Sequence, residues 1–207
     1  HNVNLGAQVL LVPDGLGRFR GELNLFLRET SELIVLLGTD RDFRYENVFA
    51  ARSMGTEVSG GWASPGGWLS IDGNLTYVDF RNTSSEGPFE ANNGDRVPNQ
   101  PFLFANVMAS ARDSNLVDDG DELSLLWGLR FVGAFFRGWE STGLRQFKPE
   151  VPDQAVQFVS LRYDFSLPDF DLSLTGEVAN LTDADAFDFF GVQKPGRSVF
   201  LKTVVGL

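Results

Sequence analysis

Cysteine is absent from this 207-residue chain, and histidine occurs once, as His1. Without thiols the chain can form neither a disulfide scaffold nor a thiolate metal site. A single histidine at the first position offers no base for a Ser-His-Asp triad and no His-rich metal site. We therefore expect no catalytic residue, no metal site and no cofactor, and we do not expect an enzyme.

Long apolar runs and excess basic charge are also missing. No stretch approaches the roughly 18 consecutive apolar residues of a membrane-spanning helix. The net charge of -11 argues against a nucleic-acid partner and against a basic face for anionic lipid. No charged-then-apolar signal segment opens the chain and the first residue is not Met, so we expect a mature form or a fragment. What is abundant is Gly, at 22, and Phe, at 19, and this favours β structure over helix.

Apolar and polar residues alternate repeatedly along the chain. Leu23, Leu25 and Leu27, for example, alternate with Glu22 and Asn24. A period of two predicts strands with one apolar and one wet face, each long enough for the roughly 9 to 11 residues of a tilted membrane-spanning strand. The predicted strands lie near 3–12, 18–29, 47–62, 68–80, 101–112, 122–136, 155–166, 169–181 and 197–207.

The predicted connections alternate between short and long. Short turns near 13–17, 63–67 and 167–168 and an intermediate turn at 113–121 alternate with long loops at 30–46, 81–100, 137–154 and 182–196. Outer-membrane barrels show this rhythm, with short periplasmic turns and long outer loops. Aromatic residues near both sets of strand ends fit two interfacial girdles, although they could also cover a soluble core: Phe19, Trp62, Trp68, Phe165 and Phe170 by the short turns, and Tyr77, Phe80, Phe135, Phe136 and Trp139 by the long loops.

Three segments taken together resemble the C-terminal part of a TonB-dependent outer-membrane receptor. The first, FLRETSELIVLL followed by YENVFAARSMGTEVSGGW, is similar through Asn47, Ala50, Ala51, Gly55 and Glu57. The second is GDRVPNQPFLFAN, with a Pro-x-x-Pro pattern before a strand. The third, EVANLTDADAFDFFGVQKPGRSVFLKTVVGL, is similar through Asn180, Leu181, Thr182, Asp183, Pro195, Gly196 and Arg197. FFRGWES and FFGVQKPGR are closest to siderophore-associated receptors of myxobacterial type.

This resemblance implies an all-β fold, an antiparallel up-and-down transmembrane β-barrel. Residues 1–207 would be about nine C-terminal strands of a barrel of roughly 22 strands, without the plug domain. Such receptors commonly end in Phe or Trp, whereas this chain ends in Leu207.

The same resemblance implies a function. The chain would be the barrel portion of a receptor in the bacterial outer membrane that takes up a ferric siderophore or a similar large nutrient with TonB energy. Its partners would be that ligand, outer-membrane lipid and lipopolysaccharide, and the plug and TonB through the missing part.

Candidate ligand-binding residues lie in the predicted loop 137–154. Arg137, Trp139, Arg145 and Lys148 combine cations with an aromatic ring. An anionic complex with flat rings, such as a ferric catecholate, is attracted by charge, guanidinium stacking and cation–π contact. The alternative is that the cations bridge lipopolysaccharide phosphates or pair with Glu140 and Glu150, and that Trp139 belongs to the girdle.

Other features have competing explanations. Asp118, Asp119, Asp121 and Glu122 form either a calcium site or, in the absence of a calcium-loop spacing, a solvated acidic turn. A secreted β-sandwich carbohydrate-binding module, with aromatics stacked on sugars, is the alternative function. An outer-membrane enzyme such as a lipase is disfavoured by the lack of a base. The membrane hypothesis requires that Leu23, Ile71, Leu125 and Leu172 are not covered by a second protein layer.

Overall fold

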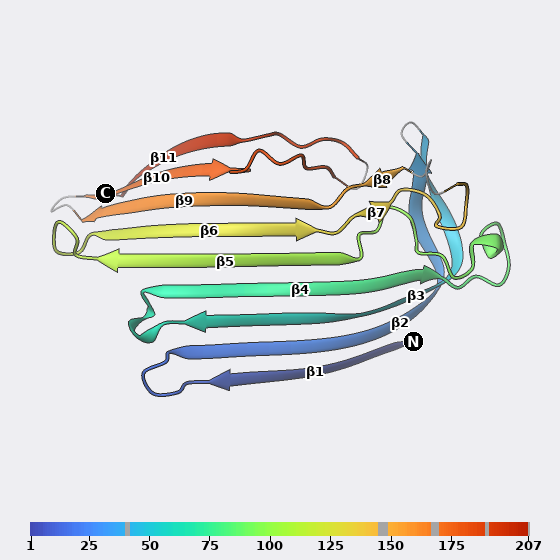
Figure 1. Ribbon diagram of the computed structural model, residues 1–207, viewed down its shortest axis with the longest axis horizontal. Coiled ribbons are helices and arrows are strands. Elements are labelled where there is room, and N and C mark those ends of the chain that lie inside the picture. Colours follow the sequence, from blue (N-terminus) through green and yellow to red (C-terminus); the bar gives the residue numbers. More distant parts are fainter. Residues whose placement is uncertain (40–41, 145–148, 167–169, 189–190, 207) are drawn as a thin grey trace.

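The computed structural model describes residues 1–39, 42–144, 149–166, 170–188 and 191–206. Within these residues, a single antiparallel sheet of nine strands runs in the order β1-β2-β3-β4-β5-β6-β9-β10-β11 (Figure 1). The strands are β1 (Asn2–Leu11), β2 (Arg18–Thr39), β3 (Asp42–Ala63), β4 (Leu69–Asn82), β5 (Leu103–Ser114), β6 (Glu122–Val132), β9 (Gln154–Ser166), β10 (Asp171–Ala179) and β11 (Ser198–Gly206).

Small elements occupy the connections. β7 (Phe135–Phe136) pairs with β8 (Glu150–Val151) between β6 and β9, and two 3-10 turns are η1 (Pro65–Gly67) and η2 (Glu90–Asn92). The turns after β1, β3 and β5 lie at one end of the sheet, at the left in Figure 1, and the longer connections lie at the other. We call the latter the loop end. In the described residues, no helix is long and apolar enough to cross a membrane.

The predicted strands are confirmed, but the predicted loop at 30–46 is wrong. β2 and β3 stay paired from Arg18↔Ala63 as far as Thr39↔Asp42, so each strand has 22 residues. The segment Leu33–Ile34–Val35–Leu36–Leu37 explains the difference, because apolar and β-branched residues favour continued pairing. The hairpin extends beyond the neighbouring strands at the loop end (Figure 1).

The register gives the sheet one apolar and one polar face. Directly paired residues of antiparallel strands lie on the same face. Leu23, Val58, Leu75 and Ala105 form one such row across four strands, whereas the next row is Asn24, Glu57, Thr76 and Phe104. We call the face of the first row the apolar face and that of the second row the polar face.

No second layer covers the apolar face within the described residues. Leu23, Ile71 and Leu125 on this face are 42%, 44% and 44% exposed, and Leu172 is half-buried. A β-sandwich would bury such side chains between two sheets. The sandwich alternative is therefore wrong, and the sheet has the face pattern of a membrane-barrel wall.

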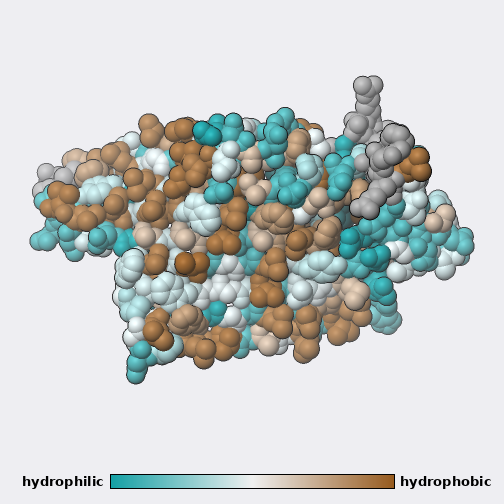
Figure 2. All heavy atoms as spheres, in the orientation of Figure 1, coloured by the Kyte–Doolittle hydropathy of each residue, from teal (hydrophilic) through white to brown (hydrophobic). Residues whose placement is uncertain are grey.

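The best-buried apolar cluster in the described part of the chain lies in the loops rather than under the sheet. Val97 is 2% exposed and packs against Leu33, Phe80, Phe89 and Trp139. Figure 2 shows hydrophilic residues gathered around this loop end, at the right, and hydrophobic residues along β1 at the lower edge. The loop end is thus a folded unit with its own small core.

The aromatic residues predicted to form two girdles are placed differently at the two ends of the sheet. Phe19 and Trp62, next to the short turns, share the apolar face, and their ring centroids are 6.3 Å apart. At the loop end, Tyr77 lies on the apolar face, but Phe80 packs against Val97 and Phe135 is buried. The predicted outer girdle is wrong for these two residues, because Phe80 packs in the loop core and Phe135 is buried.

Candidate functional site

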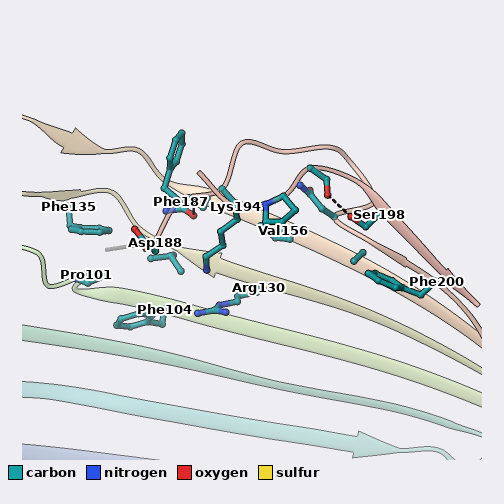
Figure 3. Close-up of a pocket in the computed structure, with 17 residues that line it drawn as sticks. Pro101, Phe104, Arg130, Phe135, Val156, Phe187, Asp188, Lys194, Ser198 and Phe200 are labelled. Atoms are coloured by element: carbon teal, nitrogen blue, oxygen red, sulfur yellow. Dashed lines mark hydrogen bonds between the residues drawn. The ribbon is translucent and has the colours of Figure 1, made fainter. Parts of the chain in front are cut away.

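A cavity of about 450 Å³ lies on the polar face at the loop end (Figure 3). Its floor consists of side chains that the register places on this one face. Phe104 pairs with Val132, which pairs with Gln154, and Arg130 pairs with Val156. Ser198 and Phe200 of β11 extend the floor to the edge of the sheet.

The roof of the cavity is the segment before β11, which we call the arm (residues 184–188 and 191–196). The Lys194 N–H donates to the Ala186 carbonyl at 2.7 Å, and Phe187 and Gln193 form an antiparallel bridge, so the arm folds back on itself. The Phe187 N–H donates to Oε1 of Gln154 at 2.7 Å. This bond ties the arm to β9 directly over the cavity floor.

Two sequence motifs anchor the ends of the arm. Asn180, at a φ of +50°, accepts the Ala184 N–H and donates to the Ala184 carbonyl, both at 2.9 Å. Asp183 accepts the Arg197 N–H at 2.7 Å, and a Cβ on Gly196 would lie 2.7 Å from the same carboxylate oxygen. The Asn-Leu-Thr-Asp and Pro-Gly-Arg segments therefore meet, and the glycine permits the close approach.

Two cations face the cavity. Arg130 rises from β6, and Figure 3 shows Lys194 extending from the arm toward the strands below it. Among the described residues, neither side-chain cation has a hydrogen bond or an ion pair, while Asp188 is the only carboxylate in the lining. The remaining lining is largely apolar, with Phe104, Phe135 and Phe200 among its residues. Such a cavity suits a ligand that combines negative charge with flat or apolar groups.

Two of the four predicted ligand-binding residues lie away from the cavity, and the other two lie outside the residues that the structure describes. Arg137 is 9% exposed, and its guanidinium lies against the arm, since a Cβ on Gly191 would be 3.1 Å from Nη1. The Trp139 ring is 5.4 Å from the Phe89 ring within the loop core. Arg145 and Lys148 lie outside the described residues. Neither Arg137 nor Trp139 belongs to the cavity lining, and a role of the four residues in ligand binding stays a prediction.

The alternative partners proposed for these cations are partly placed. Glu140 lies 3.7 Å from Nη1 of Arg96 and accepts the Arg96 backbone N–H at 3.2 Å. Glu150 belongs to β8. Glu140 therefore connects the loop after β7 to the loop after β4.

The acidic turn before β6 is built around one carboxylate. Asp121 is 3% exposed and accepts the backbone N–H groups of Leu116, Val117 and Asp118 at 2.7, 2.9 and 3.2 Å, together with the Tyr163 hydroxyl. These donors, the Tyr163 hydroxyl first, lower the pKa of Asp121 to about 2. No group of acidic residues in the described chain has a metal-binding arrangement. Asp121 is a turn-forming residue.

The sequence contained a signal for the cavity that we did not use. Arg130, Phe104 and Phe200 occupy polar-face positions near the loop end of their strands. Large aromatic rings on a face that carries Asn74 and Asn106 on neighbouring positions farther from the loop end indicate a local apolar surface on an otherwise wet face. The register across five strands was needed to show that these positions converge.

A family model described as "TonB dependent receptor-like, beta-barrel" matches residues 1–181. No curated protein gives a significant match to the sequence. The all-β barrel fold predicted from the sequence is confirmed by the family match and by solved structures.

Three of these solved structures are similar over almost the whole chain. The ferric preacinetobactin receptor BauA from Acinetobacter baumannii is 17% identical with a TM-score of 0.70, over 100% of this chain and 29% of its own. The copper transporter OprC is 20% identical with a TM-score of 0.66, over 99% and 30%. The ferric-catecholate import receptor Fiu from K12 E. coli is 18% identical with a TM-score of 0.61, over 99% and 27%.

At these identities the likeness establishes the fold alone. The chain spans about 30% of the length of the solved structures it matches.

Proposed function

This chain belongs to the TonB-dependent receptor family, and on that basis we propose that it forms part of the wall of a receptor that imports a ferric siderophore or a similar large nutrient. Members of this family are outer-membrane transport receptors rather than enzymes. We place this chain in the bacterial outer membrane, with energy supplied through TonB and a plug domain. The narrower likeness to receptors of myxobacterial type stays a prediction.

The observation that carries the proposal is the cavity under the arm. It lies on the polar face, which in a closed barrel faces the lumen, and at the loop end, which in such barrels faces outward. A ligand from outside would therefore meet Arg130 and Lys194 early in its path.

The chemistry of the lining supports an anionic ligand. Arg130 offers a planar guanidinium and Lys194 a mobile ammonium, so both can neutralise carboxylate, catecholate or hydroxamate oxygens. Phe104 and Phe200 provide surfaces for flat groups. BauA is a ferric preacinetobactin receptor and Fiu a ferric-catecholate import receptor, which is consistent with this choice of ligand class.

Binding and uptake of ferric siderophores by cells that produce the natural full-length protein test the proposal. Under iron limitation, we expect Arg130→Gln and Lys194→Gln each to weaken binding of an anionic ferric siderophore about tenfold, because each removes a charge-assisted contact. Lys202→Gln is the matched control, since Lys202 lies on the polar face of β11 farther from the loop end. Equal affinity in all four proteins, across a panel of ferric siderophores, would contradict the ligand assignment.

Location is tested separately. We expect the protein in the outer-membrane fraction, with a mobility on denaturing gels that changes on heating. Recovery in the soluble fraction would overturn the receptor proposal itself.

The same binding assay tests the prediction made from the sequence, with alanine substituted at Arg137, Trp139, Arg145 and Lys148.

A further inference from the structure

A row of charged side chains crosses the apolar face just beyond its last apolar residues at the loop end. In the register of the strands, Glu29 pairs with Arg52 and Arg52 pairs with Arg81. Arg81 in turn forms an isolated backbone β-bridge with Arg96. Because paired residues share a face, three arginines stand next to one another on adjacent segments. We call Arg52, Arg81 and Arg96 the arginine row.

The arginine row begins where the apolar face ends. Two residues nearer the middle of the sheet, the same face carries Leu27 and Met54, and on β4 the aromatic Tyr77 precedes Asp79 and Arg81. In a barrel wall this level is the boundary between acyl chains and lipid head groups. The loops beside the row identify it as the boundary at the outer end.

Neighbouring groups hold two of the three guanidiniums in place. The Asp79 carboxylate accepts hydrogen bonds from the Nε–H of Arg81 at 2.7 Å and from the Nε–H of Arg96 at 3.0 Å. Arg96 also lies 4.3 Å over the Phe102 ring, and its Nη2 is 3.3 Å from the Tyr77 hydroxyl. These contacts fix the orientation of Arg81 and Arg96 before any ligand arrives.

Donors remain available on the arginine row. Within the described residues, the Arg52 side chain has no hydrogen bond or ion pair, and Arg81 uses Nε and Nη1 but not Nη2. Arg52 and Arg81 are direct cross-strand partners, and like charges in that position destabilise a sheet unless an anion lies between them. The carboxylates nearby are Asp79 and Glu140, which contact Arg81 or Arg96, and Glu29 at the far end of the row.

We propose that the arginine row binds the phosphate of an outer-leaflet lipid between Arg52 and Arg81, with the acyl chains of that lipid against the apolar face. The site needs a ligand that is anionic at the head and apolar below it, and a phosphorylated lipid has both properties in this order. The attraction is local, since the whole chain has a net charge of -11. The inference rests on the proposed outer-membrane location and is independent of the transported ligand.

Native mass spectrometry of the full-length protein with added lipid A tests the inference. We expect Arg52→Gln to reduce the bound fraction of phosphorylated lipid A about fivefold, and Arg52→Gln with Arg81→Gln to reduce it further by a similar factor. Arg28→Gln is the matched control, because Arg28 lies on the polar face of β2 at a similar height. This control is expected to bind lipid A like the unchanged protein.

Two further binding experiments separate the possible outcomes. Lipid A without phosphates should bind all variants equally weakly, and inorganic phosphate should not displace phosphorylated lipid A, since it lacks the acyl contribution. Equal retention of phosphorylated lipid A by the Arg52→Gln and Arg28→Gln proteins would overturn the inference while leaving the receptor proposal intact. Displacement by inorganic phosphate would overturn the lipid assignment. A protein that never reaches the membrane fraction overturns the receptor proposal first.

Discussion

At the scale of single residues, two glycines on the polar face make room for phenylalanine rings from the neighbouring strand. A Cβ on Gly128 would lie 2.2 Å from Cε1 of Phe158, and one on Gly55 would lie 2.7 Å from Cζ of Phe26. Each ring lies over a glycine with which its own residue is paired. Phe26, an exception to the alternation in the sequence, is thereby explained.

Substitution of these glycines should have distinguishable effects. Gly128→Ala forces the Phe158 ring to move and should lower the free energy of unfolding by about 1 to 3 kcal/mol. Adding Phe158→Leu should restore most of that loss. Gly55→Ala should not be rescued by Phe26→Leu, because the added Cβ would also lie 2.1 Å from the Tyr77 carbonyl oxygen. Urea unfolding of the four variants measures this, and equal rescue at both sites would contradict the interpretation.

At the scale of elements, side chains rather than repetitive structure fix the connections. Asp121 collects three backbone N–H groups of the turn before β6, and Gln154 holds the arm above β9. One side-chain acceptor contributes to each element, in the arm beside the Asn180 and Asp183 contacts at its ends. A change of that acceptor should loosen the element without unfolding the sheet.

The turn before β6 should loosen in acid. The pKa of Asp121 is lowered from 3.8 to about 2, chiefly by the Tyr163 hydroxyl, so its carboxylate stabilises the turn above pH 3.8. That contribution is lost as the pH falls from about 4 through about 2, because protonation then removes the charge that the donors stabilise. Hydrogen exchange at Leu116 and Val117, corrected for its intrinsic pH dependence, should rise in this window. Asp121→Asn should abolish the pH dependence, whereas Asp119→Asn, from the same turn, should retain it.

The arm should respond to the acceptor at position 154. Gln154→Leu leaves the Phe187 N–H without its partner, so exchange at the Phe187 amide should increase at least severalfold, about the effect of one lost hydrogen bond. Gln154→Glu keeps an acceptor and should retain most of the protection. If both variants exchange alike, the arm is held by other contacts.

At the scale of the whole molecule, the two faces of the sheet require two different solvents. Leu125 lies on the apolar face and is 44% exposed, while its neighbour Leu126 lies on the polar face. A monomeric soluble sheet would not leave so many large apolar side chains uncovered on one side. Lipid on that side would keep these apolar side chains out of water, because every strand in the wall then meets acyl chains on one face and water on the other.

Adjacent leucines test the assignment of the faces. Leu125→Arg should destabilise the membrane-inserted barrel, by at most the roughly 2 to 4 kcal/mol of a charge on the lipid face at the midplane. Leu126→Arg should be tolerated, since its side chain faces water. Folding into lipid vesicles, followed by the heat-dependent gel shift, measures both. Equal loss in the two variants would mean that the faces do not meet different solvents.

The strands and their faces were predictable because alternation is local. Leu23, Ile71 and Leu125 each lie in a stretch where a period of two can be recognised from neighbouring residues alone. The long hairpin was missed because 33–37 is a continuous apolar run, which has no period to indicate that pairing continues. The family resemblance was likewise local, being carried by short motifs, and those of the third segment anchor the arm.

The site depended on contacts between distant segments. Arg130, Lys194 and Phe104 come from three separate parts of the chain, and only the register of β5, β6 and β9 with the fold of the arm places them around one cavity. Trp139 was a candidate as an aromatic ring near cations in a predicted loop, but it packs in the loop core with Val97 and Phe89. The sequence alone determined which side chains point to which side of each strand, since a two-residue period needs no partner. Tertiary structure decided which of them meet, because strand pairing and loop packing join residues that are far apart in the chain.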